Sequence, residues 1–581
     1  MYIVNPLNPD ILTDGERYTL EQKLKKLLVD EDCFIYVQPI INELKPDFIA
    51  IGKKFGVLII EVKDWDDDYI QSANPNYVIS KTNKKYRNPI SQVNHYSSIV
   101  HSKLNGVEEF FDSNGNLIIP VSMAIFYVNL SESSIDKHLN LTHENISIYD
   151  KRSLRQLSLS ELIVNSNNPI SDDEIKAVRG VLFPEITIPN ENLNSNDELS
   201  SISNIRALDY EQEEFAKKIP NGHYMVSGIP GSGKTVMLLS RALHLAQRHD
   251  QYKILIITYT KALSNKLKHQ LNVKLKEMHV TERMLERIEI KTFHKLCFDL
   301  VGKPKHTQER QNEDYYNEFW PKEAIMAVKN NPLYDAVLVD EYQDFHADWF
   351  TLCRDICKKN DNNDENLFFA GDRLQRIYDV TWSSYKEIGI NIHGGGRSKL
   401  LKTPYRTNQN HLDFALQFLS LDESLSKDIN KFYEMNDINN FSMYKNNIDI
   451  VNGTTSSLLK YIQKLIVELD IMPEDILILC HRTYEPDEIL KMLPSHISSM
   501  FVSGKDPIKG KGLITTYHSS KGLEAKYCIL FKIDEFEMNK KNRCLLYVGM
   551  TRASEKLIVH YAYDKGFAEE ITKMLSAAEV V

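Results

Sequence analysis

The chain has 581 residues, more than one hydrophobic core usually organises, so we expect about two to four domains. Hydrophobic residues make up 42% and charged residues 26%, which excludes a disordered, collagenous or coiled-coil chain, and the net charge of −10 excludes a uniform basic coat. There is no long apolar run, no secretory leader pattern and no CxxC pair among the seven cysteines, so we expect a cytoplasmic protein with no membrane span, disulfide framework or zinc ribbon.

A helix followed by a hairpin of two strands is predicted near the start of the chain. ERYTLEQKLKKLL at 16–28 has helical periodicity, and PDFIAIG and GVLIIEVK read as neighbouring strands. Asp47 lies at the start of the first strand, and Glu61 and Lys63, two apart at the end of the second, share a face. A carboxylate pair can bind Mg²⁺, and a nearby lysine can stabilise charge on a phosphodiester. ExK alone is more commonly a surface salt bridge.

Other residues around this hairpin favour the catalytic interpretation. Glu16 on the preceding helix adds a carboxylate, and Gln92 and Tyr96 follow at helical spacing on one face. The elements follow one another in a particular order: a helix, a strand with Asp, a strand with ExK, and then QxxxY. This order resembles the PD-(D/E)xK nuclease core, and more closely the nuclease-related NERD domain, over about 10–130. The resemblance implies a Mg²⁺-dependent DNA nuclease with these catalytic residues: Glu16, Asp47, Glu61, Lys63, Gln92 and Tyr96, of which Asp47 and Glu61 hold the metal.

A polar segment, PNENLNSNDELSSISN at 189–204, is expected to be a linker. It would close a nuclease-like domain at 1–188, of which 131–188 carry no motif. Beyond it, short β-branched runs alternate with helical patterns, which predicts an α/β fold with parallel sheets. We expect two lobes, at 205–400 and 401–581, with ligands at the carboxyl ends of their strands.

A phosphate-binding loop stands at the start of the first lobe. The segment 228–235 matches GxxxxGK[ST] between a strand and a helix, so its backbone N–H groups can surround phosphates. The apolar strand 337–340 ends in Asp340, suited to hold Mg²⁺, and Glu341, suited to orient the attacking water. The loop residues expected to bind nucleotide are Gly228, Gly231, Ser232, Gly233, Lys234 and Thr235, with Thr235 also on the metal.

DEYQD at 340–344 resembles the UvrD/Rep-type superfamily-one helicases, and the other motifs of that family appear in order over about 200–560. The resemblance implies a fold of two RecA-like lobes, ATP and Mg²⁺ as cofactors, and DNA as partner. It places Gln212 and Tyr405 on the adenine and Glu524 at the nucleotide. It makes Gln375 the residue that couples ATP to DNA, and it places Arg406 and Arg552 at the γ-phosphate.

Nucleic-acid contacts are implied by the same motifs. The expected residues are Tyr259, Thr260, Phe293, His294, Tyr378, Thr516 and His518. Lysines over 261–276 form either a phosphate track or a solvated helix face. Arg376 and Val380 depart from the family pattern, which leaves stacking around Tyr378 open. The intervals 293–340 and 406–515 are short, which predicts reduced accessory insertions and favours movement on single strands over strong duplex unwinding.

The leading interpretation is an ATP-driven DNA translocase or helicase coupled to a Mg²⁺-dependent nuclease. The resemblance implies 3′→5′ movement and a role in bacterial DNA processing or anti-phage defence, on a single-stranded track or at duplex ends. An alternative is a nucleic-acid-stimulated ATPase switch whose amino-terminal domain binds DNA or a partner without cutting. An RNA substrate, a homo-oligomer and a defence-system partner protein also stay open.

Overall fold

The computed structural model describes most of the chain, namely residues 1–4, 12–42, 44–139, 145–162, 169–189, 205–218, 222–279, 282–302, 315–329, 331–360, 363–376, 386–392, 396–401, 409–433, 447–505 and 507–577. The chain forms two compact units. The first contains Met1–Pro220, Leu239–Gln251 and Leu271–Arg287, and the second contains Asn221–Leu238, Tyr252–Gln270 and Ile288–Val581. Of the expected linker, 190–204 lie outside the described residues, so the four-part division at 188, 204 and 400 stays a prediction.

A mixed six-stranded sheet, ordered β1-β2-β3-β4-β8-β9, forms the core of the first unit. Its strands are β1 (Tyr2–Val4), β2 (Cys33–Val37), β3 (Phe48–Gly52), β4 (Gly56–Asp66), β8 (Val121–Asn129) and β9 (Ile146–Tyr149). β3 and β4 form the expected antiparallel hairpin, with Phe48 opposite Ile60. β4 then pairs in parallel with β8, so its apolar residues are buried on both faces.

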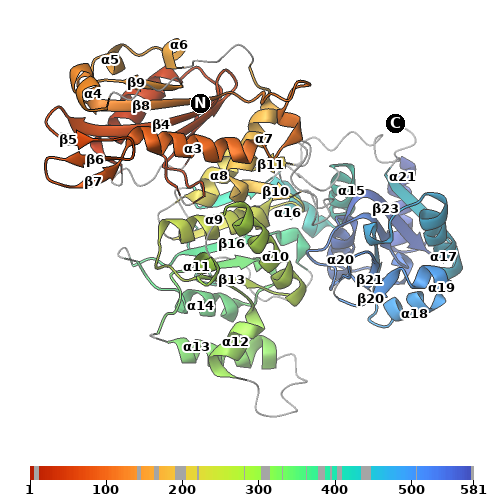
Figure 1. Ribbon diagram of the computed structural model, residues 1–581. Helices are drawn as coiled ribbons and strands as arrows, with labels where there is room; N and C mark the ends of the chain where they lie inside the picture. Colours follow the sequence, from red (N-terminus) through yellow and green to blue (C-terminus); the bar gives the residue numbers. More distant parts are fainter. Residues whose placement is uncertain are drawn as a thin grey trace. The chain divides into compact units, whose positions relative to one another are not determined.

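Helices and a small second sheet surround this core (Figure 1). The predicted first helix is α1 (Asp14–Tyr18), η2 (Thr19–Leu24) and α2 (Lys25–Leu27), which begins with a capping box between Thr13 and Glu16. An antiparallel sheet of β5 (Ile70–Ala73), β6 (Tyr77–Ser80) and β7 (Lys85–Arg87) leads into α3 (Pro89–Leu104). The region without motifs supplies β9 and the helices α4 (Glu132–Leu139), α5 (Ser153–Gln156), α6 (Leu159–Leu162) and α7 (Asp172–Leu182).

A buried ionic cluster joins several elements of the first unit. It lies between β2, α7, the short helix η4 (Pro184–Ile186) and α8 (Tyr210–Lys217). The Arg179 guanidinium donates to the Glu213 carboxylate and, at 2.8 Å, to the Tyr36 hydroxyl. The Lys217 ammonium lies 2.9 Å from Glu213 and 3.1 Å from Glu185. Two cations therefore face two anions inside the protein, which compensates for their lost hydration.

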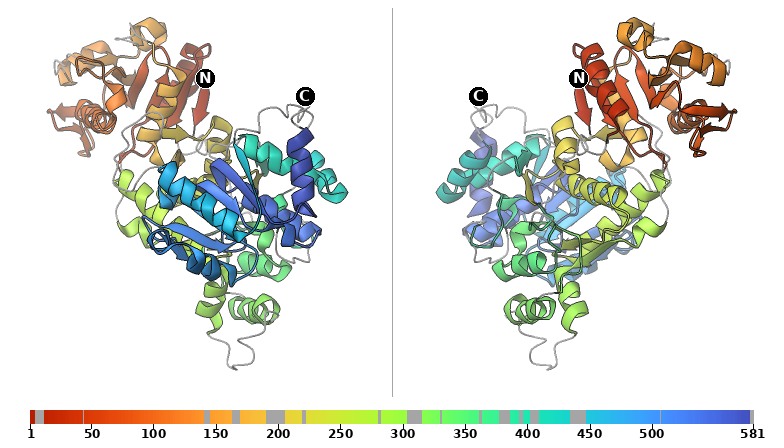
Figure 2. Two further views of the ribbon diagram at one scale, coloured as in Figure 1. Left: turned by 90° about the vertical axis from the view of Figure 1, so that its right-hand side faces the viewer. Right: turned by 90° about the vertical axis from the view of Figure 1, so that its left-hand side faces the viewer.

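The second unit contains two parallel sheets, which can be followed in the side views of Figure 2. The first is ordered β14-β13-β15-β16-β12-β17. Its strands are β12 (His223–Gly228), β13 (Ile254–Thr258), β14 (Ile288–Thr292), β15 (Ala336–Asp340), β16 (Leu367–Gly371) and β17 (Ser398–Leu401). The helices that alternate with these strands along the chain are α9 (Lys234–Arg248), α10 (Lys261–Glu277), α11 (Glu282–Leu285), α12 (Phe293–Val301), α13 (Trp320–Val328) and α14 (Ala347–Asp355). Of these, α11 and the carboxyl-terminal parts of α9 and α10 belong to the first unit.

The second parallel sheet is ordered β18-β23-β22-β19-β21-β20. Its strands are β18 (Ile448–Asn452), β19 (Ile476–Cys480), β20 (Phe501–Ser503), β21 (Gly512–Thr516), β22 (Ala525–Leu530) and β23 (Ala553–Tyr561). Its helices are α15 (Gln409–Ser420), α16 (Glu423–Tyr433), α17 (Thr455–Gln463), α18 (Glu485–Met492), α19 (Ser495–Ser498), α20 (Lys540–Met550) and α21 (Phe567–Ala577). Strands alternate with helices in both lobes, which confirms the predicted α/β class.

All seven cysteines are buried and none forms a disulfide. Burial raises the pKa of each thiol, so the reactive thiolate is suppressed. Within the described part of the chain, no helix has the length and apolar character needed to cross a bilayer.

Candidate active sites

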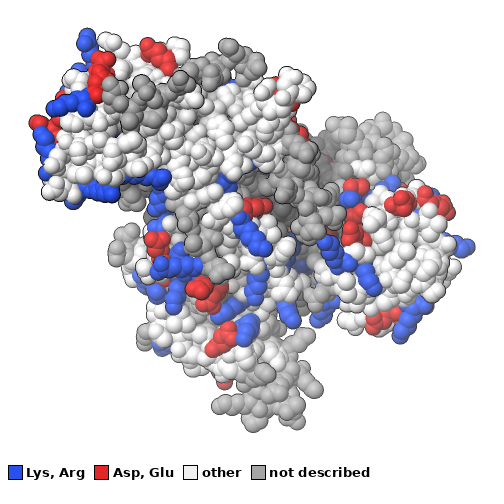
Figure 3. All heavy atoms as spheres, in the orientation of Figure 1, with Lys and Arg blue, Asp and Glu red and all other residues white. Residues whose placement is uncertain are grey.

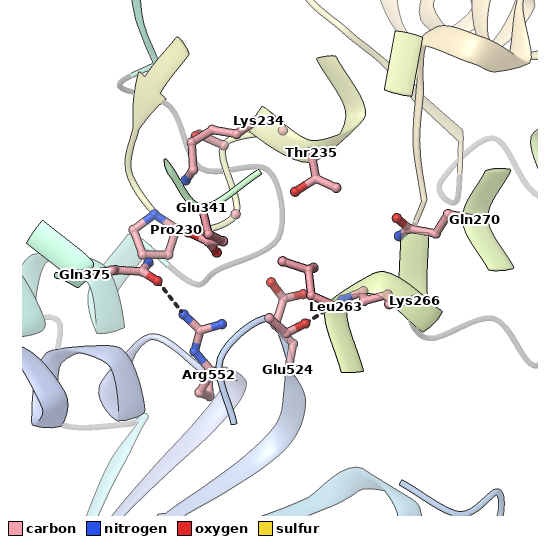
Figure 4. A pocket seen from close by; sticks show the side chains of 14 residues that line it. Pro230, Lys234, Thr235, Leu263, Lys266, Gln270, Glu341, Gln375, Glu524 and Arg552 are labelled. Atoms are coloured by element: carbon pink, nitrogen blue, oxygen red, sulfur yellow. Dashed lines mark hydrogen bonds between the residues drawn. The ribbon is translucent and has the colours of Figure 1, made fainter. Parts of the chain in front are cut away.

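A pocket in the second unit gathers most of the predicted nucleotide residues (Figure 4). They come from the phosphate loop after β12, the end of β15, the segment after β16, and the second lobe. The predicted residues among its lining are Gly231, Ser232, Gly233, Lys234, Thr235, Glu341, Gln375, Glu524 and Arg552. In the first lobe, parallel strands end at the same edge of the sheet, which explains why the loop, Glu341 and Gln375 meet, whereas Glu524 and Arg552 directly precede β22 and β23 of the second lobe.

The phosphate loop has the backbone that its glycines predict. Gly231 and Gly233 adopt left-handed φ angles of 70° and 88°, a conformation that glycine takes without strain. At Gly228, a Cβ would lie 2.7 Å from the Leu401 side chain and 2.8 Å from the Ser232 hydroxyl, so only glycine fits this close packing. The Lys234 ammonium donates to the carbonyls of Gly228 and Ile229, at 2.9 and 2.8 Å.

The acidic end of β15 faces the loop. The Thr235 hydroxyl donates to an Asp340 oxygen at 3.2 Å, which brings together the two groups expected on Mg²⁺. Burial and the adjacent Glu341 carboxylate raise the pKa of Asp340 to about 7. Burial also tends to raise the pKa of Glu341, but the lysines at 521 and 234 more than offset it, so the pKa of Glu341 is lowered and the side chain stays ionised.

Lys521 is a residue of this site that sequence reasoning missed. It follows β21 and is 2% exposed, and its ammonium lies 2.5 Å from the Asp344 carboxylate and 3.0 Å from the Gln375 carbonyl. Beside it, Arg552 donates to the Gln375 side chain at 3.2 Å. Two cations of the second lobe therefore contact polar groups of the first lobe next to the phosphate loop. The chain separation of 177 residues between Lys521 and Asp344 left no local signal for this pair.

Some predicted nucleotide and nucleic-acid residues cannot be placed in the pocket. Tyr378, Tyr405 and Arg406 lie outside the described residues. Gln212 lies on α8 in the first unit, where it is buried and its Oε1 has no hydrogen-bond partner among the described residues. The adenine and γ-phosphate roles of these residues stay predictions.

The predicted nucleic-acid residues differ in burial. Phe293 is 0% exposed, and its ring stacks on Trp349 with centroids 3.9 Å apart, so it packs in the core here, and its role in contacting bases stays a prediction. Tyr259 and His294 are half-buried beside the same tryptophan. The Thr260 hydroxyl accepts a hydrogen bond from the Leu263 amide at the start of α10. Thr516 ends β21 and His518 follows it; both are half-buried, and their DNA role stays a prediction.

The lysines of α10 do not form one track. Lys274 is buried and donates to the carbonyls of Pro184 and Thr187. Lys266 lines the nucleotide pocket and donates to the Gly522 carbonyl at 2.9 Å. The exposed lysines of this helix are Lys261, Lys268 and Lys276.

The predicted nuclease residues of the hairpin meet in the first unit. The Lys63 ammonium lies 2.5 Å from one oxygen of Glu61, and an Asp47 oxygen accepts from the Val62 amide at 2.6 Å. Burial, then the charge of Glu61, raises the pKa of Asp47, and burial raises that of Glu61 as well. Burial would lower the pKa of Lys63, but Glu61 and Asp47 raise it overall, so this lysine stays charged.

The remaining predicted residues border the same carboxylates. The Gln92 amide donates to the Tyr96 hydroxyl at 3.4 Å, and burial with the charges of Glu61 and Asp47 raises the pKa of Tyr96. Sequence reasoning missed Gln38, which follows β2 with a left-handed φ of 45° and donates to Glu16 at 2.9 Å. A positive φ at a glutamine has no sequence signature, so this contact became visible only in the fold.

The chemistry of the nuclease carboxylates fits a divalent cation. Glu61 is 2% exposed, and its second oxygen has no hydrogen-bond partner among the described residues. Buried carboxylates with raised pKa values gain most from a metal ion, which replaces their lost hydration. In the described ranges, however, no set of three or more His, Cys, Asp or Glu residues is grouped to hold a metal ion. Asp47 and Glu61 would need water or backbone oxygens to complete the coordination.

Family models match three parts of the chain. The model described as UvrD/REP helicase N-terminal domain matches 208–331 and 315–386, and that of the UvrD-like helicase C-terminal domain matches 511–560. The nuclease-related domain model matches 12–127, which includes every predicted nuclease residue.

Two curated relatives are both named as ATP-dependent helicase/nuclease subunits. The protein of Syntrophomonas wolfei is 32% identical over 108 residues, and that of Staphylococcus haemolyticus is 22% identical over 169 residues. The matches cover 16% and 27% of this chain, and the chain spans only 9% and 13% of these relatives.

Proposed function

From the premise that this chain belongs to the proteins that join a nuclease-related domain to a UvrD-like helicase, we propose that it is an ATP-driven DNA translocase or helicase coupled to a Mg²⁺-dependent DNA nuclease. The observation that carries the proposal is the nucleotide pocket, where the phosphate loop, Glu341, Gln375 and Arg552 line one space. A structural role alone does not require a lysine, a carboxylate and an arginine around the same loop.

The ATPase chemistry follows from this arrangement. Lys234 and the loop amides bind the phosphates, and Thr235 with Asp340 would hold Mg²⁺, which would neutralise phosphate charge. Glu341 stays ionised and orients the attacking water. Arg552 comes from the other lobe, so it stabilises the transferring phosphoryl group only when the lobes are closed. Repeated closing and opening would move the chain along a strand.

The nuclease chemistry uses the hairpin. A metal ion held by Asp47 and Glu61 would activate water and stabilise charge on a phosphodiester. Lys63, which stays protonated beside Glu61, offers a cation to the same charge, while Gln92 and Tyr96 border the site and position the substrate. Movement 3′→5′ and a role in bacterial DNA processing or anti-phage defence belong to the proposal through the family resemblance.

A second candidate function is favoured by one observation. The described residues hold no group of three potential metal ligands, and a domain without a complete metal site would bind DNA without cutting it. The chain would then be an ATPase switch stimulated by nucleic acid.

The test is a Mg²⁺-dependent cleavage time course on linear, circular and single-stranded DNA, with and without ATP. Wild type is compared with Lys63→Ala and with the control Lys54→Ala, which removes an exposed lysine paired with Glu31 at 2.8 Å. We expect Lys63→Ala to abolish cleavage while DNA-stimulated ATP hydrolysis persists, and we expect Lys54→Ala to cleave like wild type. Absence of cleavage by wild type, with ATP hydrolysis intact, would favour the switch.

A further inference from the structure

The small sheet β5-β6-β7 has no role in the proposed chemistry. It lies in the chain between β4, which carries Glu61 and Lys63, and α3, which carries Gln92. One side of the sheet packs inward, because Val78 is buried and the Tyr86 ring lies 6.0 Å from that of Trp65. These contacts hold the sheet on the nuclease domain, and Figure 1 draws it at the end of the domain away from α7.

The other side of the sheet combines cations with an aromatic ring. Tyr77 is directly opposite Arg87, and Ile79 is opposite Lys85, so these four residues share a face. The Lys85 ammonium lies 3.9 Å from the centre of the Tyr77 ring. Lys85 and Arg87 are exposed, and Figure 3 shows Lys and Arg side chains along this edge of the domain.

These two cations differ from neighbouring ones in their pairing. Lys81 lies 2.7 Å from Asp68, and Lys151 lies 2.7 Å from Asp67. Among the residues that the structure describes, neither Lys85 nor Arg87 has an acidic partner within ion-pair distance. Their charge is therefore available to a ligand, whereas that of the two paired lysines is already compensated.

The face also continues into the nuclease site. Asn88 directly follows Arg87, and its side chain caps α3 by accepting from the Ile90 amide at 3.0 Å. The same helix carries Gln92 and Tyr96, which are hydrogen-bonded at 3.4 Å and border the carboxylates. A strand lying on Lys85 and Arg87 would thus be close to the residues that border the carboxylates.

We propose that the outer face of β5-β6-β7, formed by Tyr77, Lys85 and Arg87, binds the DNA backbone and guides it to the nuclease carboxylates. Phosphates would lie on the two cations, and the tyrosine ring offers a surface for a sugar or base. The chain carries a net charge of −10, so DNA is repelled by much of the protein and needs such local cations. This inference rests on the proposed nuclease function and specifies where its substrate binds.

The test uses the full chain with Lys63→Ala, so that DNA is not cut during binding. Binding of a blunt duplex of about 20 base pairs is measured by fluorescence anisotropy over a range of salt concentrations. The double variant Lys85→Ala/Arg87→Ala should lower the slope of log K against log salt by about 2 and raise Kd at least about tenfold near 0.1 M salt. The control Lys81→Ala/Lys151→Ala removes the same charge from paired lysines and should leave the slope unchanged.

The double variant should also retain ATP hydrolysis stimulated by single-stranded DNA, because neither residue belongs to the second unit. With Lys63 intact, it should raise KM for cleavage at least about tenfold and leave kcat within about twofold. An unchanged salt slope, or an equal change in the control, would overturn the proposal. If wild type cuts no DNA, the nuclease function fails, and the binding measurement still decides whether this face contacts DNA.

Discussion

Arg179→Ala is the change whose effect on stability can be worked out most directly. Arg179 donates to Glu213 and Tyr36, and its guanidinium lies 3.8 Å from the centre of the Phe34 ring. Glu213 is 0% exposed, so truncating the arginine leaves an anion inside the protein with Lys217 as its remaining cation. Removing one member of a buried ion pair costs about 3–5 kcal/mol. For a unit of this size, about 2–4 °C per kcal/mol predicts a fall in Tm of about 6–20 °C.

The matched control is Lys176→Ala on the same helix. Lys176 pairs with Asp173 at 3.7 Å, and both side chains are more than half exposed, so this change should cost under about 1 kcal/mol. Urea titrations followed by far-ultraviolet circular dichroism would compare the free energies of unfolding, and a thermal scan would give the midpoints. Equal losses in the two variants would refute the reasoning that burial makes the Arg179 cluster costly to break.

Four further predictions concern the two sites. Lys234→Ala should abolish DNA-stimulated phosphate release without changing the Tm of the chain, and retained turnover would contradict the motor assignment. Asp340 must lose its proton to bind Mg²⁺, and its pKa is about 7. The Mg²⁺ concentration needed for half-maximal ATP hydrolysis should therefore rise about tenfold per pH unit below 7 and level off above it. A Mg²⁺ concentration for half-maximal hydrolysis that is flat from about pH 6 to 8 would refute this. Lys521→Ala leaves its buried carboxylate partner uncompensated and should lower kcat at least about tenfold, whereas Lys526→Ala, which breaks a more exposed pair, should change it little. The pKa of Asp47 is raised in the folded chain, so its protonated form stabilises the fold below the unfolded pKa near 4, and this contribution is lost as pH rises through the folded pKa. Asp47→Asn should therefore raise Tm at about pH 8, with little gain at about pH 4. A lower Tm of this variant at about pH 8 would count against the prediction.

The sequence predicted those parts of the fold and site whose signals are local. The phosphate loop and the acidic end of β15 each combine a short motif with a strand terminus, and parallel topology then requires them to meet. The β3–β4 hairpin was likewise visible, because Asp47, Glu61 and Lys63 stand at the ends of two apolar runs separated by a short turn.

The missed features depend on contacts between distant segments. Phe293 lies in a motif associated with DNA contact, but its ring packs on Trp349, 56 positions away, and sequence cannot distinguish a presented ring from a packed one. Lys521 pairs across 177 residues, and Gln38 reaches Glu16 only because its backbone turns into the left-handed region. Lys274 belonged to an apparent basic run and is instead buried on backbone carbonyls.

The burial of all seven cysteines has a practical consequence for observing this protein at work. Native thiols with raised pKa values should react slowly with maleimides, so a single cysteine introduced on the surface would be the preferred attachment point for a fluorophore. Dyes placed at Lys84 and at Lys509, both exposed, would report distance changes between the two compact units during turnover without first removing the natural cysteines. Conversely, any gain in labelling of the unmodified chain would report the opening of its cores.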